Sequence, residues 1–187
     1  MAKPMRRLTT DDYAVDAVMG AKAFVGAWLC RRLEDGTVMR RRITETEAYC
    51  GEEDTACHAH RGRTARTDVM YATGGCAYIY LCYGMHEMLN VVTGLEGRPE
   101  AVLIRGVEGA EGPGRLTKLL KIDRSLNRED SFSPIASGLK ATARASSSPP
   151  PRVSESPTPP SATKTASGAL RSVPKGEAWR GEFFRRE

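Results

Sequence analysis

Two carboxylates and an aromatic ring recur at every second position in the run Ile43-Thr44-Glu45-Thr46-Glu47-Ala48-Tyr49. Its alternating, β-branched composition predicts a strand, and side chains two residues apart lie on one face of a strand. We therefore expect Ile43, Glu45, Glu47 and Tyr49 to point together. A carboxylate in such a face can direct a water molecule, and the tyrosine ring can stack on a flat substrate. The alternative is an ordinary solvated strand face, which is the commoner place for charged side chains.

A short acidic loop joins this run to Cys57 and His58, and Cys50 lies at its start. Cysteine and histidine are zinc ligands, but no CxxC pair accompanies them, whereas closed zinc sites draw four ligands from tighter spacings. The chain has five cysteines, an odd number without the spacing of a disulfide framework, which indicates a reducing compartment. We therefore expect no metal ion and no other cofactor.

The loop from Gly51 to Thr67 begins acidic and becomes basic at Arg63 and Arg66. Guanidinium groups and backbone N–H donors in such a loop suit phosphate oxygens. Arg40 to Arg42 form a second basic run, which is either a solvated face or, beside a nucleic-acid site, a set of phosphate contacts. The formal charge of +5 and the pI of about 9.1 favour a polyanionic partner.

Three tyrosines cluster in the run from Cys76 to Tyr83, which ends at a glycine. The run predicts a strand, and Met85 to Val92 is expected to return beside it as a hairpin partner. Tyr78 and Tyr80 share a face, whereas Tyr83, beside the turn glycine, points elsewhere. Neighbouring tyrosines can serve cross-strand packing alone. A tyrosine at a hairpin tip is also well placed to wedge between bases.

The remaining elements follow from capping, periodicity and turn signals. In chain order we expect N-cap residues over 9–12, a loose helical stripe over 13–25, a strand over 23–32, a two-residue hairpin turn at Asp35-Gly36, a strand over 37–49, a strand over 100–108 and a helix over 115–122. Within the strand over 100–108, Arg105 is expected to stand isolated in apolar surroundings.

After about Ser131 the composition shifts to Ser, Pro, Thr, Ala, Arg and Lys. Such a segment has too little apolar surface to offset the entropy of ordering it. We therefore expect one folded domain over 1–135 and a largely disordered tail over 136–187, with an aromatic anchor at 177–184. No apolar run approaches the length that spans a membrane, and the N-terminus lacks the apolar core of a signal peptide.

Several motifs, in order along the chain, resemble the alkyladenine (3-methyladenine) DNA glycosylase family. They are Glu45-Thr46-Glu47-Ala48-Tyr49; Asp54, Ala56 and His58; Gly62, Thr64 and Arg66; Tyr78 to His86; Asn90-Val91-Val92; Ala101 to Arg105; and Gly112 to Leu116. The resemblance covers roughly Leu8 to Asn127. It implies an α+β fold: a single mixed domain with a curved, mainly antiparallel sheet, whose aromatic hairpin projects into the minor groove of DNA.

The resemblance also implies a role for each matching residue of a base pocket. Glu47 corresponds to the general base that orients the attacking water. Tyr49 and His58 correspond to one wall of the pocket, and Tyr80 to the opposing wall. Asn90 corresponds to the residue that screens out some normal purines.

Other matching residues are implied to contact DNA. Tyr83 corresponds to the intercalating residue that fills the gap left by a flipped nucleotide. Arg105 corresponds to an arginine near the backbone of that nucleotide, and we expect Arg63 and Arg66 to contact the DNA backbone as well. Glu45 is a rival for the role of general base, or a structural acceptor of hydrogen bonds.

By resemblance, this chain is a hydrolase of damaged, chiefly alkylated, purines in double-stranded DNA, which acts by base flipping and water attack. No lysine lies between Lys22 and Lys118. Because glycosylases with lyase activity form a Schiff base through an amine, water is the expected nucleophile and the enzyme is expected to be monofunctional. The N-terminal amine is a formal alternative. We expect a monomer that works in the cytoplasm (the bacterial nucleoid), or in the nucleus if the source is eukaryotic.

The chain departs from the family pattern in a shortened loop near 109–112 and in its Ser/Pro-rich C-terminal part. A catalytically impaired protein that binds lesions in the minor groove is therefore an alternative. A third hypothesis, hydrolysis of free nucleosides, would not depend on Tyr83.

Overall fold

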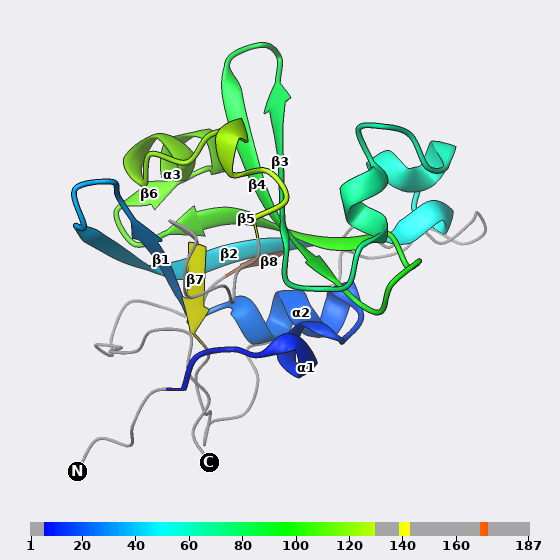
Figure 1. The fold of residues 1–187 in the computed structure, drawn as a ribbon, viewed down its shortest axis with the longest axis horizontal. Coiled ribbons are helices and arrows are strands. Elements are labelled where there is room, and N and C mark those ends of the chain that lie inside the picture. The colour runs from blue at the N-terminus through cyan, green and yellow to red at the C-terminus, as the bar shows by residue number, and fades with distance from the viewer. Residues whose placement is uncertain (1–5, 130–138, 143–168, 172–187) are drawn as a thin grey trace.

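An antiparallel sheet organises the chain (Figure 1). The computed structural model describes residues 6–129, 139–142 and 169–171. The strands in these ranges are β1 Trp28–Arg32, β2 Val38–Cys50, β3 Ala77–Cys82, β4 His86–Thr93, β5 Glu100–Val107, β6 Ala110–Glu111, β7 Leu139–Thr142 and β8 Ala169–Arg171. Their spatial order is β3-β4-β5-β2-β1-β7, while β6 pairs with β5 and β8 with β2.

Helices are few and short by comparison. They are α1 Thr10–Tyr13, α2 Ala17–Phe24 and α3 Pro113–Leu119, with the 3-10 helices η1 Gly51–Glu53, η2 His58–Arg61, η3 Asp68–Tyr71 and η4 Arg124–Leu126. The predicted helical stripe over 13–25 corresponds to α2 and to the last residue of α1. Each helix has its own N-cap: Thr9 forms a capping box with Asp12, and the Asp16 side chain accepts from the backbone N of Met19. Together, helices and sheet confirm the predicted α+β class with a single mixed domain.

The β1–β2 hairpin turns through three residues, not the predicted two. The backbone N of Leu33 donates to the carbonyl of Thr37 at 2.8 Å, and that of Gly36 donates to Leu33 at 3.0 Å. Gly36 has a φ of 82°, the left-handed conformation that closes a three-residue hairpin loop. The flanking strands lie where the sequence predicts them.

Strand β2 carries the carboxylates, and its pairing with β5 is irregular just before them. The register shifts between Ile43 and Glu45 and shifts again between Glu45 and Thr46. Ile43, expected to point with the carboxylates, instead belongs to the hydrophobic core and is 1% exposed. The predicted alternation holds from Glu45 onward, because Thr46 is buried while Glu47 is half-buried on the other face.

Helix α2 covers the face of the sheet that Thr46 occupies. Its buried residues recur at the helical period, namely Ala17, Gly20, Ala21 and Phe24. The Thr46 hydroxyl donates to the carbonyl of Ala21 at 3.0 Å, and the backbone N of Ala17 donates to Glu100 at 2.7 Å. Because successive strand residues alternate between faces, the odd-numbered residues after Glu45 are turned away from α2.

Strands β3 and β4 form a hairpin that extends beyond the other strands (Figure 1). Its tip is closed by a hydrogen bond of 3.1 Å from the backbone N of Met85 to the carbonyl of Cys82. Tyr83 and Gly84 have φ angles of 50° and 69°. Positive φ at both central residues is typical of type I′ hairpin turns, whose twist matches that of the strands.

The short segment after β5 closes as a tight hairpin. Val107 pairs with Ala110, so the turn consists of Glu108 and Gly109, and Gly109 has a φ of 86°. This turn leads directly to α3, so the shortened loop is part of the sheet.

Helix α3 begins two residues before the predicted helix over 115–122, because Pro113 occupies a favourable first helical position. A Cβ atom added to Gly114 would lie 2.9 Å from Nδ1 of His86. Only glycine at this position lets the helix approach the first residue of β4, next to the turn of the β3–β4 hairpin, so closely.

Two short strands, β7 and β8, come from the segment predicted to be a tail, and they pair with β1 and β2. The rest of that segment, including the anchor expected at 177–184, lies outside the described residues. Among the described helices, none combines the length and apolar character needed to cross a membrane.

Candidate active site

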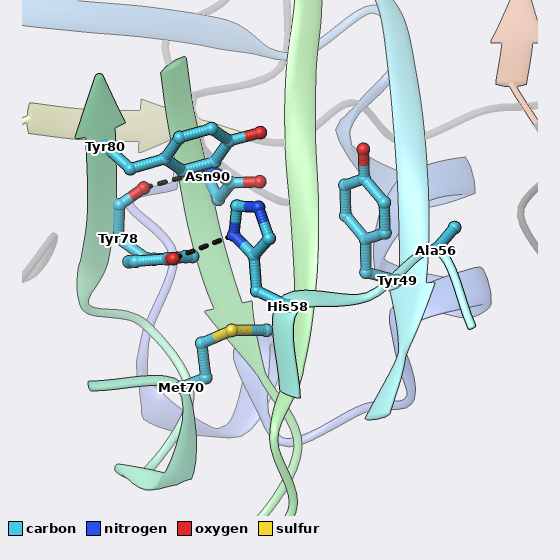
Figure 2. A pocket seen from close by; sticks show the side chains of 7 residues that line it. All are labelled: Tyr49, Ala56, His58, Met70, Tyr78, Tyr80 and Asn90. Carbon is cyan, nitrogen blue, oxygen red and sulfur yellow. Dashed lines mark hydrogen bonds between the residues drawn. The ribbon is translucent and has the colours of Figure 1, made fainter. Parts of the chain in front are cut away.

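A hollow of about 230 Å³ lies on the face of the sheet opposite α2 (Figure 2). Three strands and the loop after β2 supply its lining, which consists of Tyr49, Ala56, His58, Met70, Tyr78, Tyr80 and Asn90. The structure thus brings together all four residues predicted for a base pocket: Tyr49, His58, Tyr80 and Asn90.

Asp54 shapes the loop that carries His58. Its carboxylate is 2% exposed and accepts from the backbone N atoms of Cys50 at 3.1 Å and Ala56 at 3.0 Å. These bonds fold the chain back after β2, so that η2 begins at His58 beside the sheet. The aspartate therefore has a structural role.

His58 lies against Tyr80, contrary to the expectation that these residues form opposing walls. Their ring centroids are 4.5 Å apart in an edge-on arrangement, which leaves no room for a base between them. The Nδ1 atom of His58 is 2.9 Å from the hydroxyl of Tyr78, a bond that draws the ring toward β3. Figure 2 shows Tyr49 across the hollow from this pair, so the open space lies between Tyr49 and the His58–Tyr80 pair.

Asn90 lies 1% exposed on β4, directly opposite Tyr78 in the strand register. Its amide nitrogen donates to the backbone carbonyls of Tyr78 at 3.1 Å and Met88 at 3.4 Å. Both donor hydrogens are thereby used, so the side chain can offer the hollow only an acceptor oxygen. Figure 2 shows that oxygen pointing away from Tyr78.

Glu47 lies beside the hollow rather than in its lining. Its Oε2 atom is 2.6 Å from Nη1 of Arg105, and Oε1 of Glu45 is 3.3 Å from Nε of the same arginine. Burial raises the pKa of the Tyr49 hydroxyl, and the adjacent Glu47 carboxylate raises it further by charge and by accepting its hydrogen bond. Glu47 therefore contacts one wall of the hollow through Tyr49.

The sequence suggested that Arg105 stands isolated in apolar surroundings, but the structure pairs it with Glu45 and Glu47. Burial alone would lower its pKa, but the charges and hydrogen bonds of Glu47 and Glu45 outweigh it and raise the pKa above its usual value. The guanidinium holds both carboxylates, so it fixes the orientation of Glu47 in the described structure.

Tyr83 lies at the tip of the β3–β4 hairpin with 88% of its surface exposed. It is separate from the hollow, whereas Tyr78 and Tyr80 of the same strand line it. A fully exposed ring on a closed turn is available to a partner.

The two arginines expected to contact DNA have partners within the chain. Arg63 pairs with Asp68 at 2.7 Å and lies over the ring of Tyr71. Arg66 lies over the ring of Tyr80, 5.2 Å from its centroid, and its Nη2 is 3.4 Å from Nε2 of His58. The Arg63 side chain is 62% exposed and Arg66 is also exposed, so phosphate can still reach both.

Sequence reasoning did not assign Ala56, Met70 or Tyr78 to the pocket. The alternation of β3 could have indicated Tyr78, because it shares a face with Tyr80. No sequence signal marks Met70, which reaches the hollow from η3. Within residues 6–129, 139–142 and 169–171, no group of three or more His, Cys, Asp or Glu side chains could hold a metal ion.

The site is thus a hollow lined by aromatic side chains, with a carboxylate held by an arginine beside it and an exposed tyrosine at the tip of the neighbouring hairpin. The sequence profile of the methylpurine-DNA glycosylase family matches residues 11–111. The chain belongs to this family.

Relatives agree with that membership. The chain is 47% identical over 135 residues to a protein of Psychrobacter cryohalolentis, covering 57% of this chain and 64% of that protein. It is 45% identical over 141 residues to a protein of Myxococcus xanthus, covering 70% and 72% respectively. A protein of Natranaerobius thermophilus is 41% identical over 146 residues, covering 66% and 73%. All three carry the provisional name 3-methyladenine DNA glycosylase. The chain thus spans less than two thirds of the first of these proteins.

Proposed function

We propose that this protein is a DNA repair glycosylase that hydrolyses the N-glycosidic bond of alkylated or otherwise damaged purines in double-stranded DNA. The observation that carries the proposal is the Glu47 carboxylate, held beside the hydroxyl of Tyr49 at the edge of the aromatic hollow. Family membership supports the same activity.

The hollow is proposed to receive a damaged base that has flipped out of the duplex. A base inside a duplex cannot reach an enzymatic carboxylate, so it must leave the stack at a cost of a few kcal/mol, which a damaged pair reduces. Stacking on aromatic side chains returns about 1–3 kcal/mol per base. Tyr49 on one side of the hollow and the His58–Tyr80 pair on the other are the stacking surfaces, and the exposed ring of Tyr83 fills the gap in the duplex.

Bond cleavage then requires one carboxylate. As the C1′–N bond breaks, its electron pair goes to the base and the sugar gains oxocarbenium character. The ionised Glu47 stabilises that cation and accepts a proton from the water whose oxygen forms the new bond to C1′. With no lysine between Lys22 and Lys118, we propose a monofunctional hydrolase with water as the nucleophile.

DNA binding draws on the basic character of the chain. Arg66 lies over Tyr80 at the hollow, and together with the exposed Arg63 and the formal charge of +5 it favours the phosphate backbone. Arg105 is proposed to contact the backbone of the flipped nucleotide while it still holds Glu47. We propose that the protein acts as a monomer, on chromosomal DNA, without a cofactor.

Single-turnover base release from a duplex with one hypoxanthine or one 3-methyladenine tests the proposal. Wild type should release both bases, and Glu47→Gln should lower the rate by about 10²- to 10⁴-fold while lesion binding persists. Glu45→Gln is the matched control, because it removes a neighbouring carboxylate on the same face and should cost far less. Lesion binding by wild type without release of either base would instead favour the alternative, an impaired lesion-binding protein.

A further inference from the structure

The hydrogen bonds of the hollow leave the hydroxyls of Tyr78 and Tyr80 as possible donors to a base, and His58 orients that of Tyr78. An uncharged damaged purine is a poor leaving group, because the departing base takes the electron pair of the glycosidic bond and becomes anionic. A hydrogen-bond donor aimed at the base disperses that charge. A purine alkylated on a ring nitrogen already carries a positive charge and needs such a donor much less.

Most polar groups of the hollow cannot donate to a base. The amide hydrogens of Asn90 are used by two backbone carbonyls. The hydroxyl of Tyr49 has the carboxylate of Glu47 beside it as an acceptor, which contributes to its raised pKa. Ala56 and Met70 have no side-chain donor. The remaining polar side chains in the lining are those of His58, Tyr78 and Tyr80.

Arg66 decides which nitrogen of His58 carries hydrogen. A guanidinium only donates, so Nε2 of His58, 3.4 Å from Nη2 of Arg66, must be the acceptor. Burial and the charge of Arg66 lower the pKa of His58, so the ring is neutral near pH 7. The single hydrogen of a neutral imidazole therefore lies on Nδ1, which donates to the hydroxyl oxygen of Tyr78 at 2.9 Å.

The hydroxyl group of Tyr78 can therefore donate its own hydrogen to a group in the hollow. Its oxygen accepts from Nδ1 of His58 at 2.9 Å. A hydroxyl has two acceptor positions and one donor hydrogen, so accepting from His58 leaves that hydrogen free to be donated. The side chain is 2% exposed and lines the hollow, and its hydrogen has no acceptor among the described residues.

We propose that the hydroxyl of Tyr78 is the hydrogen-bond donor to the excised base, and that it makes uncharged damaged purines substrates of this site. Arg66 and His58 are positioning residues that set its direction. The inference rests on the proposed glycosylase function. Tyr78 keeps its proton throughout, since burial raises the pKa of its hydroxyl despite the opposing charge of Arg66. The bond stabilises the departing base, which later takes a proton from water.

Tyr78→Phe tests this inference, because it removes one oxygen and keeps the buried ring. The substrates are two duplexes of one sequence, carrying hypoxanthine (uncharged) or 7-methylguanine (cationic). At saturating protein, we expect hypoxanthine release to fall by about 10- to 100-fold and 7-methylguanine release to change less than about threefold. The protein concentration at half-saturation should not change for either duplex.

Tyr71→Phe is the matched control, since it also removes a hydroxyl from a buried tyrosine, one that donates to Glu52 outside the hollow. It should leave both rates unchanged. Arg66→Met should reproduce part of the selective loss. Without the Arg66 donor at Nε2 of His58, the ring hydrogen is no longer kept on Nδ1, where it is donated to Tyr78.

Equal losses on both duplexes, no loss on either, or a selective loss in Tyr80→Phe instead of Tyr78→Phe would each overturn the role of Tyr78. Wild type that releases 7-methylguanine but not hypoxanthine would also overturn it, while the proposed function would stand. Wild type that releases neither base would remove the proposed function and this inference together.

Discussion

Nη1 of Arg105 lies 2.6 Å from Oε2 of Glu47, across the pairing of β2 and β5. The two residues are 58 positions apart in the sequence, and only the antiparallel sheet brings them together. Because Nε of the arginine also meets Glu45, the guanidinium has little freedom to turn. The carboxylate that we propose as general base is therefore oriented before any substrate binds.

Arg105→Gln should release Glu47 from this orientation. We expect single-turnover base release to fall by about tenfold or more, because a misplaced catalytic group loses much of its effect. Arg105→Lys should recover only part of the rate, since an ammonium cannot contact both carboxylates with a planar fork.

Arg42→Gln is the control for the arginine prediction, because Arg42 pairs with Glu108 in the same sheet. It should retain the rate of wild type at saturating protein. Full activity of Arg105→Gln would contradict the positioning role of the arginine.

Tyr83→Gly should separate stability from function. Tyrosine at a φ of 50° is strained by roughly 1–2 kcal/mol, and glycine removes this strain. Glycine also raises the conformational entropy of the unfolded chain, which offsets part of the gain in stability. We expect equal or slightly higher stability in urea unfolding, together with a marked loss of base release from duplex DNA.

Tyr83→Asn is the companion variant, because asparagine also tolerates this backbone conformation but carries no ring. It should lose release from duplex DNA to the same extent. If both variants keep full activity on the duplex, the enzyme hydrolyses nucleosides without intercalation, and the repair function is wrong.

Asp54→Ala should destabilise the protein although the residue touches no substrate. It removes the acceptor for two backbone N–H groups in a buried loop, which costs about 2 kcal/mol. Urea unfolding measures the loss, and Thr55→Ala at the exposed neighbouring position is the control. Base release by the folded variant should also fall, because the loop carries His58. An unchanged unfolding midpoint would contradict the structural role.

His58 gives the protein a specific dependence on pH. Its folded-state pKa is lowered, first by burial and then by Arg66, so the unfolded chain binds a proton at a higher pH than the native state does. Stability therefore falls as pH drops through the unfolded value of about 6.5. We expect Tm to decrease between pH 7.5 and pH 5, and to decrease less in His58→Gln. An identical decrease in both proteins would assign the effect to other groups.

Local patterns predicted the strands well, because alternation and turn residues act over a few positions. The run from Glu45 to Tyr49 and the tyrosines of β3 lie on strands as expected, and four predicted pocket residues meet in one hollow. The patterns missed what depends on distant contacts. They could not show that Arg105 reaches two carboxylates, or that His58 sits against Tyr80 because it bonds to Tyr78.

Irregular backbone also escaped prediction. The register shifts at Glu45, the three-residue turn at Gly36 and the tight turn at Gly109 each depend on how two strands meet. The expected intercalation by Tyr83, the phosphate contacts and the organisation of residues 136–187 stay predictions.

The paired register shifts in β2 and β5 have a consequence for how this gene can vary. Ile43 pairs with Val107 and Thr46 with Ile104, so both strands advance by three residues and the two shifts cancel. Loss of the codon for Thr46 would shift every later residue of β2 by one position against β5 and would exchange inside for outside along that part of the strand. The acid would then be pressed into α2, and an alanine would stand where it had been. A single substitution in this strand keeps its register against β5, but an inserted or deleted residue does not.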